Sequence, residues 1–458
     1  MEMDWKVNGE GAFGDSSALE DLHKALGTAG TGDLGTTFAD GTALRVESLE
    51  GTLKVVTYKA KALKLWNMLA KKPAYNTVEQ YNILDSYGGA GNAFFEEGGV
   101  APAEDSTYTR KTGEVKFMGV LREVTHAMTL VTPAHGNVQD MQAAEGTLWL
   151  IRKLNEALYY ANDTYNPLAF KGIRQQIVDS VGETAENIVD CRGLPLSEDL
   201  LQDGARIIAD NYSDSETFQM FAGMSVLSDI GKALFPRQRI GMPAPQNGVA
   251  GVPLTGFAAD AGYINFNKEI FLRPSGGVPA AAVTGSPAAP VAPTMVAAAE
   301  ATSRMDAGSY YYAVASINHR GESVATPSAA AVDVAAGEKV TVTVTRQRNA
   351  PAATGYKIYR GTTVAGLKYM KTVADPGGEL ATFTVVDLNA DIPGTSEVFL
   401  FDMDGDQCMS YKQLAPLMKL PLAVVSAAFR FMILLYGVPQ VYAPRKQVIF
   451  KNVGAYTD

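Results

Sequence analysis

Residues 274–295 of this chain, PSGGVPAAAVTGSPAAPVAPTM, contain no charged residue and are rich in Pro, Ala and Gly. This composition is typical of a linker. Beyond it the period changes to two. Val340, Val342 and Val344 alternate with threonines, and in residues 310–315 Tyr, Tyr and Val alternate with Tyr, Ala and Ala. Short strands of this kind, separated by turn segments, predict an all-β sandwich over about 296–393. Mixed helix and strand patterns return in 397–458, so we predict that the sandwich is inserted in a larger domain.

The bulk composition limits the class of protein. A chain of 458 residues suits about two to four domains, and 47% hydrophobic with 19% charged residues is ordinary for a folded globular protein. The net charge of -10 argues against a dedicated nucleic-acid binder, although it leaves room for a local basic strip. Two cysteines, Cys191 and Cys408, are too few for a disulfide scaffold and indicate a reducing compartment such as the bacterial cytoplasm.

Two segments are unable to bury enough surface by themselves. Residues 1–47 are rich in Gly, Ala, Asp and Thr, and such an arm is ordered only where something, such as a neighbouring subunit, ties it down. Residues 86–131 begin with a Gly-rich stretch and continue as TYTRKTGEVKFMGVLREVTHAMTLV, which predicts a long two-stranded ribbon. Because isolated hairpins are marginal in water, this ribbon needs another surface, in the same chain or from a neighbouring copy.

Residues 49–72 have the periodicity of a basic amphipathic helix. Leu53, Val56, Ala60 and Leu63 fall on one face, while the lysines lie largely elsewhere (Lys54, Lys61, Lys64, Lys71 and Lys72). A helix of this kind can bind a membrane, a nucleic acid or an acidic partner, but a solvated charged face is the more frequent explanation.

Two further helices are predicted. In residues 140–163 a stripe of Leu148, Ile151, Leu154 and Leu158, widened by Trp149 and Leu150, predicts a long helix that is buried over much of its circumference. In residues 196–211, Ser197 is a candidate N-cap, and Leu201, Ala205 and Ile208 share one face.

Neither a membrane span nor a signal peptide is expected. The longest apolar stretch, residues 414–438, is interrupted by Pro416 and Pro421 and by the charged residues Lys419 and Arg430. It therefore predicts a buried helix and strand. The first residues, MEMDWKVNGEGAFGDSS, have neither a basic region nor an apolar core.

Motifs that could carry chemistry are weak. GxGxxG occurs at Gly9–Gly14 and Gly30–Gly35, but neither copy follows an apolar strand, as a dinucleotide site requires. The segment 402–413 begins like a calcium loop with three aspartates, yet Gln407 and Gln413 stand where a glycine and a bidentate glutamate are needed. We therefore expect an acidic turn there, with a weak cation site as the alternative.

Isolated titratable residues do not form a constellation either. The histidines lie far apart in the sequence, without metal-ligand spacing (His23, His126, His135 and His319). Arg192 beside Cys191 can lower a thiol pKa, although a lone cysteine is more often a small buried apolar residue. We predict no catalytic residue, no cofactor-binding residue, no metal ligand and no bound cofactor.

The order of elements resembles the Hong Kong 97-type capsid fold of tailed-phage major capsid proteins and encapsulins. The resemblance rests on the arm, the basic helix, the ribbon, the long helix and the final VYAPRKQVIFKNVG. It rests also on the segments NPLAFKGIRQQI, SVLSDIGKALFPRQRIGMP and GFAADAGYINFNKEIFLRP. It covers nearly the whole chain except the sandwich, whose YYYAVASINHRGES and TGYKIYRGT resemble strands of fibronectin type III and Ig-like modules.

The resemblance implies an α+β fold with a defined domain order. The expected parts are an N-terminal arm (1–47), a basic amphipathic helix and connection (48–85), an E-loop (86–131), the spine helix, P-domain and A-domain (132–293), an inserted Ig-like β-sandwich (294–394), and the rest of the A- and P-domains (395–458). The 196–211 helix would lie in the A-domain and VYAPRKQVIFKNVG in the P-domain. Some relatives cross-link subunits through Lys–Asn bonds. Lys111 and Lys116 lie in the expected E-loop, but no partner residue is identified, so we predict no cross-link for this chain.

The function that the resemblance implies is structural and not enzymatic. The protein would self-assemble as hexamers and pentamers into the icosahedral or prolate head around double-stranded DNA. It would be made in the host bacterial cytoplasm and located in the virion. Scaffolding, portal and decoration proteins are further expected partners, and no membrane is. The alternatives are an encapsulin-like compartment shell and, in a different class, a glycan-binding adhesin that acts through the sandwich.

Overall fold

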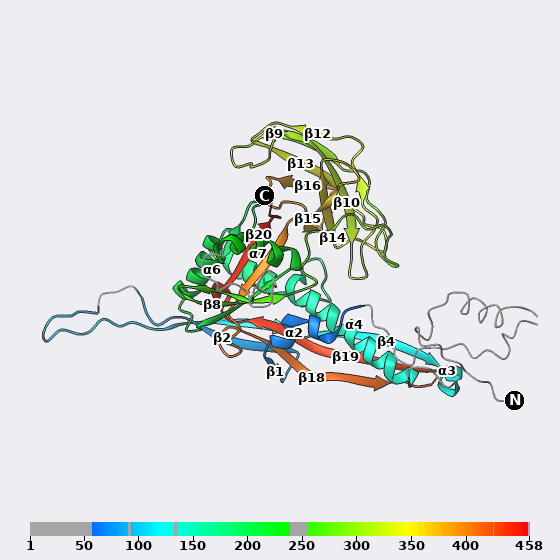
Figure 1. Ribbon diagram of the computed structural model, residues 1–458, viewed down its shortest axis with the longest axis horizontal. Coiled ribbons are helices and arrows are strands. Elements are labelled where there is room, and N and C mark those ends of the chain that lie inside the picture. Colours follow the sequence, from blue (N-terminus) through cyan, green and yellow to red (C-terminus); the bar gives the residue numbers. More distant parts are fainter. Residues whose placement is uncertain (1–56, 90–92, 132–135, 239–254, 425, 457–458) are drawn as a thin grey trace, which may run out of the picture. The chain divides into compact units, whose positions relative to one another are not determined.

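The computed structural model describes residues 57–89, 93–131, 136–238, 255–424 and 426–456 of the chain (Figure 1). The described strands form a four-stranded sheet, a six-stranded sheet, a five-stranded and a three-stranded sheet in the sandwich, and a two-stranded ribbon. The α+β fold class is therefore confirmed.

The four-stranded sheet, called the long sheet here, has the order β1, β18, β19, β4. Its strands are β1 Lys71–Pro73, β18 Met409–Pro421, β19 Ala428–Val441 and β4 Lys116–Thr125. The helix α4, Val138–Tyr160, lies along this sheet (Figure 1). Leucines at a spacing of four residues in α4 pack with the core side chains of β19 (Leu150, Leu154 and Leu158 with Phe431, Ile433 and Leu435).

The predicted long helix 140–163 is confirmed, and its predicted buried stripe is correct for Leu150, Leu154 and Leu158 only. The buried stripe begins at Gly146 and continues through Leu150, Leu154 and Leu158, whereas Leu148 and Ile151 are only half-buried and Trp149 is 39% exposed. Gly146 sets this face, because a Cβ there would lie 2.7 Å from Ile433 Cδ1. The helix can therefore approach β19 closely at this residue.

The six-stranded sheet has the order β5, β20, β17, β6, β8, β7. Its strands are β5 Ile188–Asp190, β20 Gln447–Val453, β17 Ser396–Phe401, β6 Thr217–Ala222, β8 Gly262–Lys268 and β7 Gly256–Ala259. The associated helices are α5 Ile173–Val181, α6 Glu198–Asp210 and α7 Met224–Gln238. The predicted 196–211 helix is confirmed as α6. Ser197 Oγ caps it by accepting from Leu200 N, and Leu201, Ala205 and Ile208 are buried.

The final segment VYAPRKQVIFKNVG supplies β20, which pairs with β17 and β5 in the six-stranded sheet. This strand is buried on both faces. Ile449 belongs to the core that contains the leucines of α4, whereas Val448 and Phe450 belong to the core that contains α6. Burial on both faces fits its continuous apolar sequence. The assignment of this segment to a domain stays a prediction.

The predicted two-stranded ribbon is present, but its bounds differ from the predicted ones. It is made by β2, Val78–Ser86, and β3, Thr107–Glu114, whose register runs from Val78 opposite Glu114 to Ser86 opposite Thr107. The next strand, β4, does not return along β3. It pairs with β19 in the long sheet instead, and the short helix α3, His126–Leu130, follows it. The ribbon thus begins about eight residues earlier than predicted and ends before β4.

The predicted helix over 49–72 is wrong for residues 57–72, and residues 49–56 lie outside the described residues. The chain forms a 3-10 turn, η2 Ala60–Ala62, a short helix, α2 Lys64–Met68, and then β1. Tertiary contacts explain the breaks: Trp66 N donates to Asn155 Oδ1 at 3.1 Å, and residues 71–73 pair with β18. The described lysines remain near the surface, with Lys71 over the Trp66 ring and Lys72 paired with Asp406.

The sandwich is present as two packed sheets. One contains β9 Thr294–Ala299, β13 Glu338–Thr345 and β16 Thr382–Asp387. The other contains β10 Gly308–Ile317, β11 Thr326–Pro327, β12 Val332–Val334, β14 Gly355–Gly361 and β15 Lys368–Ala374. Its core includes the alternating valines Val340, Val342 and Val344. The likeness to Ig-like and fibronectin type III modules stays a prediction.

The segment predicted as a linker packs against the sandwich. Val278 contacts a second apolar cluster with Ala313, Ala315 and Tyr359, and Tyr369 N donates to Gly276 O at 2.8 Å. An uncharged Pro/Ala/Gly composition shows that a segment lacks strong secondary structure, but it does not show whether the segment is packed. The strands on either side of the sandwich in sequence, β8 and β17, are both neighbours of β6.

Candidate assembly surfaces

The ribbon exposes most of its surface. Among the described strands, β2 and β3 pair only with each other. Large apolar side chains near its far end are open to solvent, with Tyr87 86% and Val100 92% exposed, and Phe95 and Tyr108 also exposed. Figure 1 shows the ribbon running away from the long sheet and the six-stranded sheet. Exposed apolar side chains gathered on one projecting element are typical of a contact surface for another protein.

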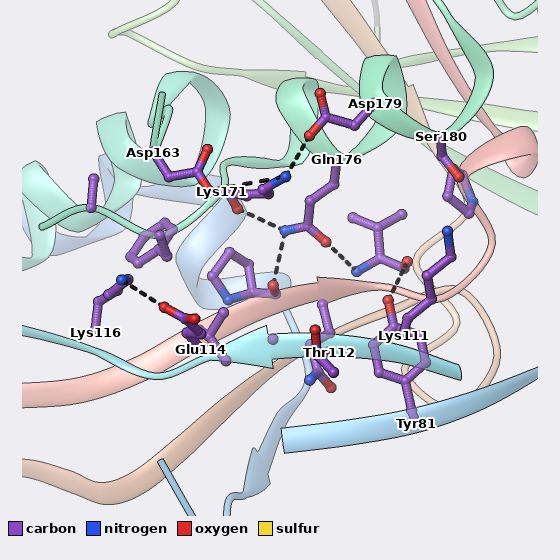
Figure 2. A pocket seen from close by; sticks show the side chains of 18 of the residues that line it. Tyr81, Lys111, Thr112, Glu114, Lys116, Asp163, Lys171, Gln176, Asp179 and Ser180 are labelled. Carbon is purple, nitrogen blue, oxygen red and sulfur yellow. Dashed lines mark hydrogen bonds and ion pairs between the residues drawn. The ribbon is translucent and has the colours of Figure 1, made fainter. Parts of the chain in front are cut away.

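The root of the ribbon meets the body at a cleft of about 310 Å³ (Figure 2). The ribbon forms one wall, α5 and the loop before it form another, and the end of β19 forms the floor. Gln176 of α5 ties helix to strand: its Nε2 donates to Pro439 O at 2.9 Å, and Val441 N donates to its Oε1 at 3.0 Å. On the ribbon side, the Tyr81 hydroxyl donates to Val441 O at 3.3 Å.

Charges of both signs line the cleft. Lys171 lies 2.7 Å from Asp179 and 3.9 Å from Asp163, and the hydrogen bond to Asp179 is the main reason that the pKa of Lys171 is raised. Lys116 pairs with Glu114 at 2.9 Å. Burial, and then the neighbouring Tyr442, raise the pKa of Tyr81 to about 12, so this hydroxyl stays protonated and can donate. The two pairs of Lys171 lie within the body, and the Lys116–Glu114 pair spans the junction between β3 and β4.

Gly113 fixes how closely the ribbon approaches β19. A Cβ on this residue would lie 2.9 Å from Nε2 of the buried Gln440. We expect Gly113→Val to destabilise the ribbon root by about 1–3 kcal/mol, as overpacking does elsewhere. Hydrogen exchange of β3 measures this effect. Thr112→Val is the matched control, because Thr112 is an exposed neighbour on the same strand. Equal exchange in the two variants would contradict the tight fit.

A second apolar surface covers the side of the long sheet that faces away from α4. Adjacent strands present it in register: Leu121 lies opposite Met432, Gly119 opposite Leu434, and Phe117 opposite Tyr436, with their rings 4.9 Å apart. On the other side of β19, Met418 lies opposite Leu434 and Leu420 opposite Met432. Phe117, Leu121 and Leu420 are exposed. This patch, named the outer face here, was not predicted. The alternation in FMGVLRE was the available signal.

The residues considered for chemistry do not come together. Asp402 is buried and accepts from the hydroxyls of Ser213 and Ser215. Burial alone would raise its pKa, but these hydrogen bonds outweigh burial and lower the pKa. Asp406 pairs with Lys72, and Gln413 lies in β18 opposite Pro73. No cluster of three potential metal ligands occurs among the described residues.

The cysteine and histidine candidates are likewise separate. Cys191 is buried, and burial together with Asp190 raises its pKa to about 12, so Arg192 does not activate the thiol. His126 starts α3 with its ring near Phe429, and His319 lies in a sandwich turn. Lys111 and Lys116 both line the cleft. His23, His135, Lys54 and both GxGxxG motifs lie outside the described residues.

Comparison with known proteins connects these surfaces to a class. No protein-family model matches the chain. The major capsid protein of Staphylococcus phage S25-3 is 26% identical over 455 residues, 95% of each chain. A similar protein of Enterococcus phage phiEF24C is 26% identical over 459 residues, 96% of each chain. Among solved structures, a capsid of a native GTA particle superimposes with a TM-score of 0.50 at 8% identity, covering 92% of this chain and all of that one.

The fold is that of Hong Kong 97-type capsid shells. Along nearly its whole length, the chain is a homologue of phage major capsid proteins. In the described part of the chain, no helix is both long and apolar enough to cross a membrane.

Proposed function

We propose that the protein assembles through hexamers and pentamers into the closed head of a tailed phage, around double-stranded DNA that it contacts without sequence specificity. It acts as a structural protein and not as an enzyme. Its partners are other copies of itself and, beyond these, scaffolding, portal and decoration proteins. The homology to phage major capsid proteins supports this proposal, and so does the capsid fold.

One observation carries the proposal: the ribbon keeps large apolar side chains in solvent, at the far end of an element that pairs with no other described strand. Two-stranded ribbons are marginal by themselves, and exposed tyrosine, phenylalanine and valine at its end gain by burial (Tyr87, Phe95 and Val100). Neighbouring copies in a closed symmetric assembly bury such surfaces at every subunit.

The outer face offers a matching apolar surface on the same chain. In the proposed assembly, the ribbon of one subunit lies across the outer face of the next. Its acidic residues, Glu96, Glu97, Glu104 and Asp105, remain at the rim, where they stay hydrated. A net charge of -10 gives DNA little general attraction. The proposed shell is therefore held by contacts between subunits, mainly apolar ones, rather than by attraction to the DNA.

The domain order follows from this proposal. The N-terminal arm is residues 1–47, and the E-loop is the ribbon of β2 and β3. The spine helix is α4. The P-domain contains the long sheet, the A-domain contains the six-stranded sheet with α6 and α7, and the Ig-like sandwich is an insertion. Nearly full-length phage relatives favour a phage head over an encapsulin-like compartment. They also favour it over an adhesin, which would act through the sandwich alone.

Sedimentation of the purified protein tests the proposal. The 48.8 kDa chain should enter particles many times heavier than a hexamer under assembly conditions. A chain that stays monomeric across salt, pH and concentration would contradict it. Particles that carry a specific cargo protein, rather than DNA, when isolated from their natural source would support the compartment instead.

Removal of the sandwich should leave the shell body folded and able to assemble. The entry and exit chains meet, because Ser275 N donates to Thr395 O at 3.0 Å and Gly394 N donates to Ser275 Oγ at 2.5 Å. Deleting residues 276–394 and joining Ser275 to Thr395 therefore bridges two residues that are already in contact. We expect particles of the same diameter in light scattering.

A deletion that cuts into the body is the matched control. Removing β17 together with the sandwich, residues 276–401, takes out a strand paired with both β6 and β20 and should yield aggregates. If the 276–394 deletion aggregates in the same way, the sandwich is not an accessory insertion.

A further inference from the structure

Glu269 is a buried residue with a carboxyl group, and it belongs to neither the ribbon, the cleft nor the outer face. It directly follows β8, and its side chain is fully buried. Its backbone N–H donates to Ala222 O at the end of β6, at 2.9 Å. Its carboxyl group reaches the first turn of α2 and the side chain of Asn155 on α4. The residue therefore lies where the six-stranded sheet, α4 and α2 meet.

The polar atoms around Glu269 are incompletely paired. Asn155 Oδ1 accepts from Trp66 N at 3.1 Å, which fastens α2 to α4. The two Glu269 oxygens, Asn155 Nδ2 and the Tyr159 hydroxyl find no partner at hydrogen-bond geometry among the described residues. The Asn155 side chain and the backbone N–H groups of Lys64, Leu65 and Phe271 lie close enough to the carboxyl group to favour its charged form. Buried polar atoms left this way destabilise their surroundings.

The groups facing Glu269 provide little neutralising charge. From α4 it faces Asn155 and the titratable Tyr159, and burial, followed by Glu269, holds the pKa of Tyr159 well above its ordinary value. From α2 it faces the backbone of Lys64 and Leu65, and after β8 the N–H of Phe271. Arg152 stacks at 5.2 Å on the Phe271 ring and pairs with Glu156 instead. Among the described residues no ion pair involves Glu269.

We propose that Glu269 is a proton-dependent tie between α2 and the shell body: the protonated carboxyl holds α2 firmly, and the ionised carboxylate loosens it. Residues 57–69 connect the first part of the chain to the body. The proton on Glu269 therefore decides how firmly that connection is docked. This tie is a property of the subunit and does not depend on the proposed assembly.

The direction of the pH effect follows from linkage. Burial raises the pKa of Glu269 above its ordinary value, against the opposing contribution of Asn155 and the backbone N–H groups. A carboxyl with a raised folded pKa binds its proton more tightly in the folded state. Its stabilising contribution is complete below the unfolded pKa and is lost as the pH rises through the folded pKa. The docking of α2 is thus firmer in mildly acidic solution than at neutral pH.

Hydrogen exchange of the full chain at about pH 4.5 and pH 7.5, corrected for intrinsic exchange, tests the tie. In the wild type, the protection of residues 63–69 should fall on going to the higher pH. The expected fall is up to about tenfold for each pKa unit by which burial shifts the group. Glu269→Gln removes the ionisable group while keeping its shape. It should show equal protection at both values, and more than the wild type at pH 7.5.

Glu156→Gln is the matched control, because Glu156 lies next to Asn155 on α4 but pairs near the surface with Arg152 and Lys153. This variant should keep the pH dependence of the wild type. Protection in the wild type that does not change with pH overturns the proposal even if Glu269→Gln fails to fold. So does a folded Glu269→Gln chain that is less protected than the wild type at pH 7.5.

Discussion

Shortening the ribbon should abolish particle formation while leaving the subunit folded. Ser86 and Thr107 are the last paired residues of β2 and β3, so an Asn-Gly turn can replace residues 87–106 and close the hairpin without changing its register. The change removes Tyr87, Phe95 and Val100, the exposed apolar residues that we assign to contacts between subunits. Sedimentation velocity should show that the heavy particles are replaced by monomers or small oligomers.

A point substitution refines this test. Phe95→Ser in the intact ribbon should slow assembly or raise the protein concentration it needs. Leu380→Ser is its control, because Leu380 is an exposed apolar residue in a sandwich turn, away from both assigned surfaces. If the shortened ribbon still gives shells of normal size and yield, the ribbon is not the contact that holds the shell together.

Asp387→Ala should unfold the sandwich without unfolding the shell body. Asp387 is buried and accepts hydrogen bonds from the Tyr312 hydroxyl at 2.8 Å and from Arg360 Nη1 at 2.6 Å. Removing the carboxylate leaves the buried Arg360 guanidinium without its counter-charge, which costs about 3–5 kcal/mol in comparable sites. Thermal unfolding followed by tyrosine fluorescence should show a separate early transition, because the sandwich has a core of its own.

Glu300→Ala is the control for the buried pair, since Glu300 pairs with Lys339 at 2.8 Å close to the surface. Exposed pairs contribute about 0–1 kcal/mol, so this variant should unfold close to the wild type. An Asp387→Ala chain that unfolds in a single transition with the body would mean that sandwich and body form one cooperative unit. That result would argue against a separable insertion.

Local patterns in the sequence predicted the elements that local contacts determine. The helix α6 has its cap at Ser197 and a single apolar face, so it was predicted with close bounds, and the alternation of valine with threonine identified β13 as a strand. Residues 57–72 failed because their conformation depends on Asn155, Glu269 and β18, which are distant in sequence. Periodicity identified β4 as a strand, but it could not show that its partner, β19, lies about three hundred residues later.

The two assembly surfaces also differ in how far the sequence could predict them. The ribbon could be predicted as a contact surface, because an element with so little to bury itself against needs a partner. For the outer face, the alternation in FMGVLRE was a signal on β4 alone, because the patch forms only when β4, β18 and β19 align their apolar residues in register. The fit of Gly113 against Gln440 was also hidden, since the two residues lie on strands far apart in the chain.

Electron microscopy of particles formed by the purified wild-type protein is the decisive test of the proposed shell. We expect closed shells whose surface is divided into fivefold and sixfold clusters of subunits, with the ribbon of each subunit lying on its neighbour. Single subunits, open sheets without fivefold closure, or shells in which the ribbon contacts only its own subunit would contradict it.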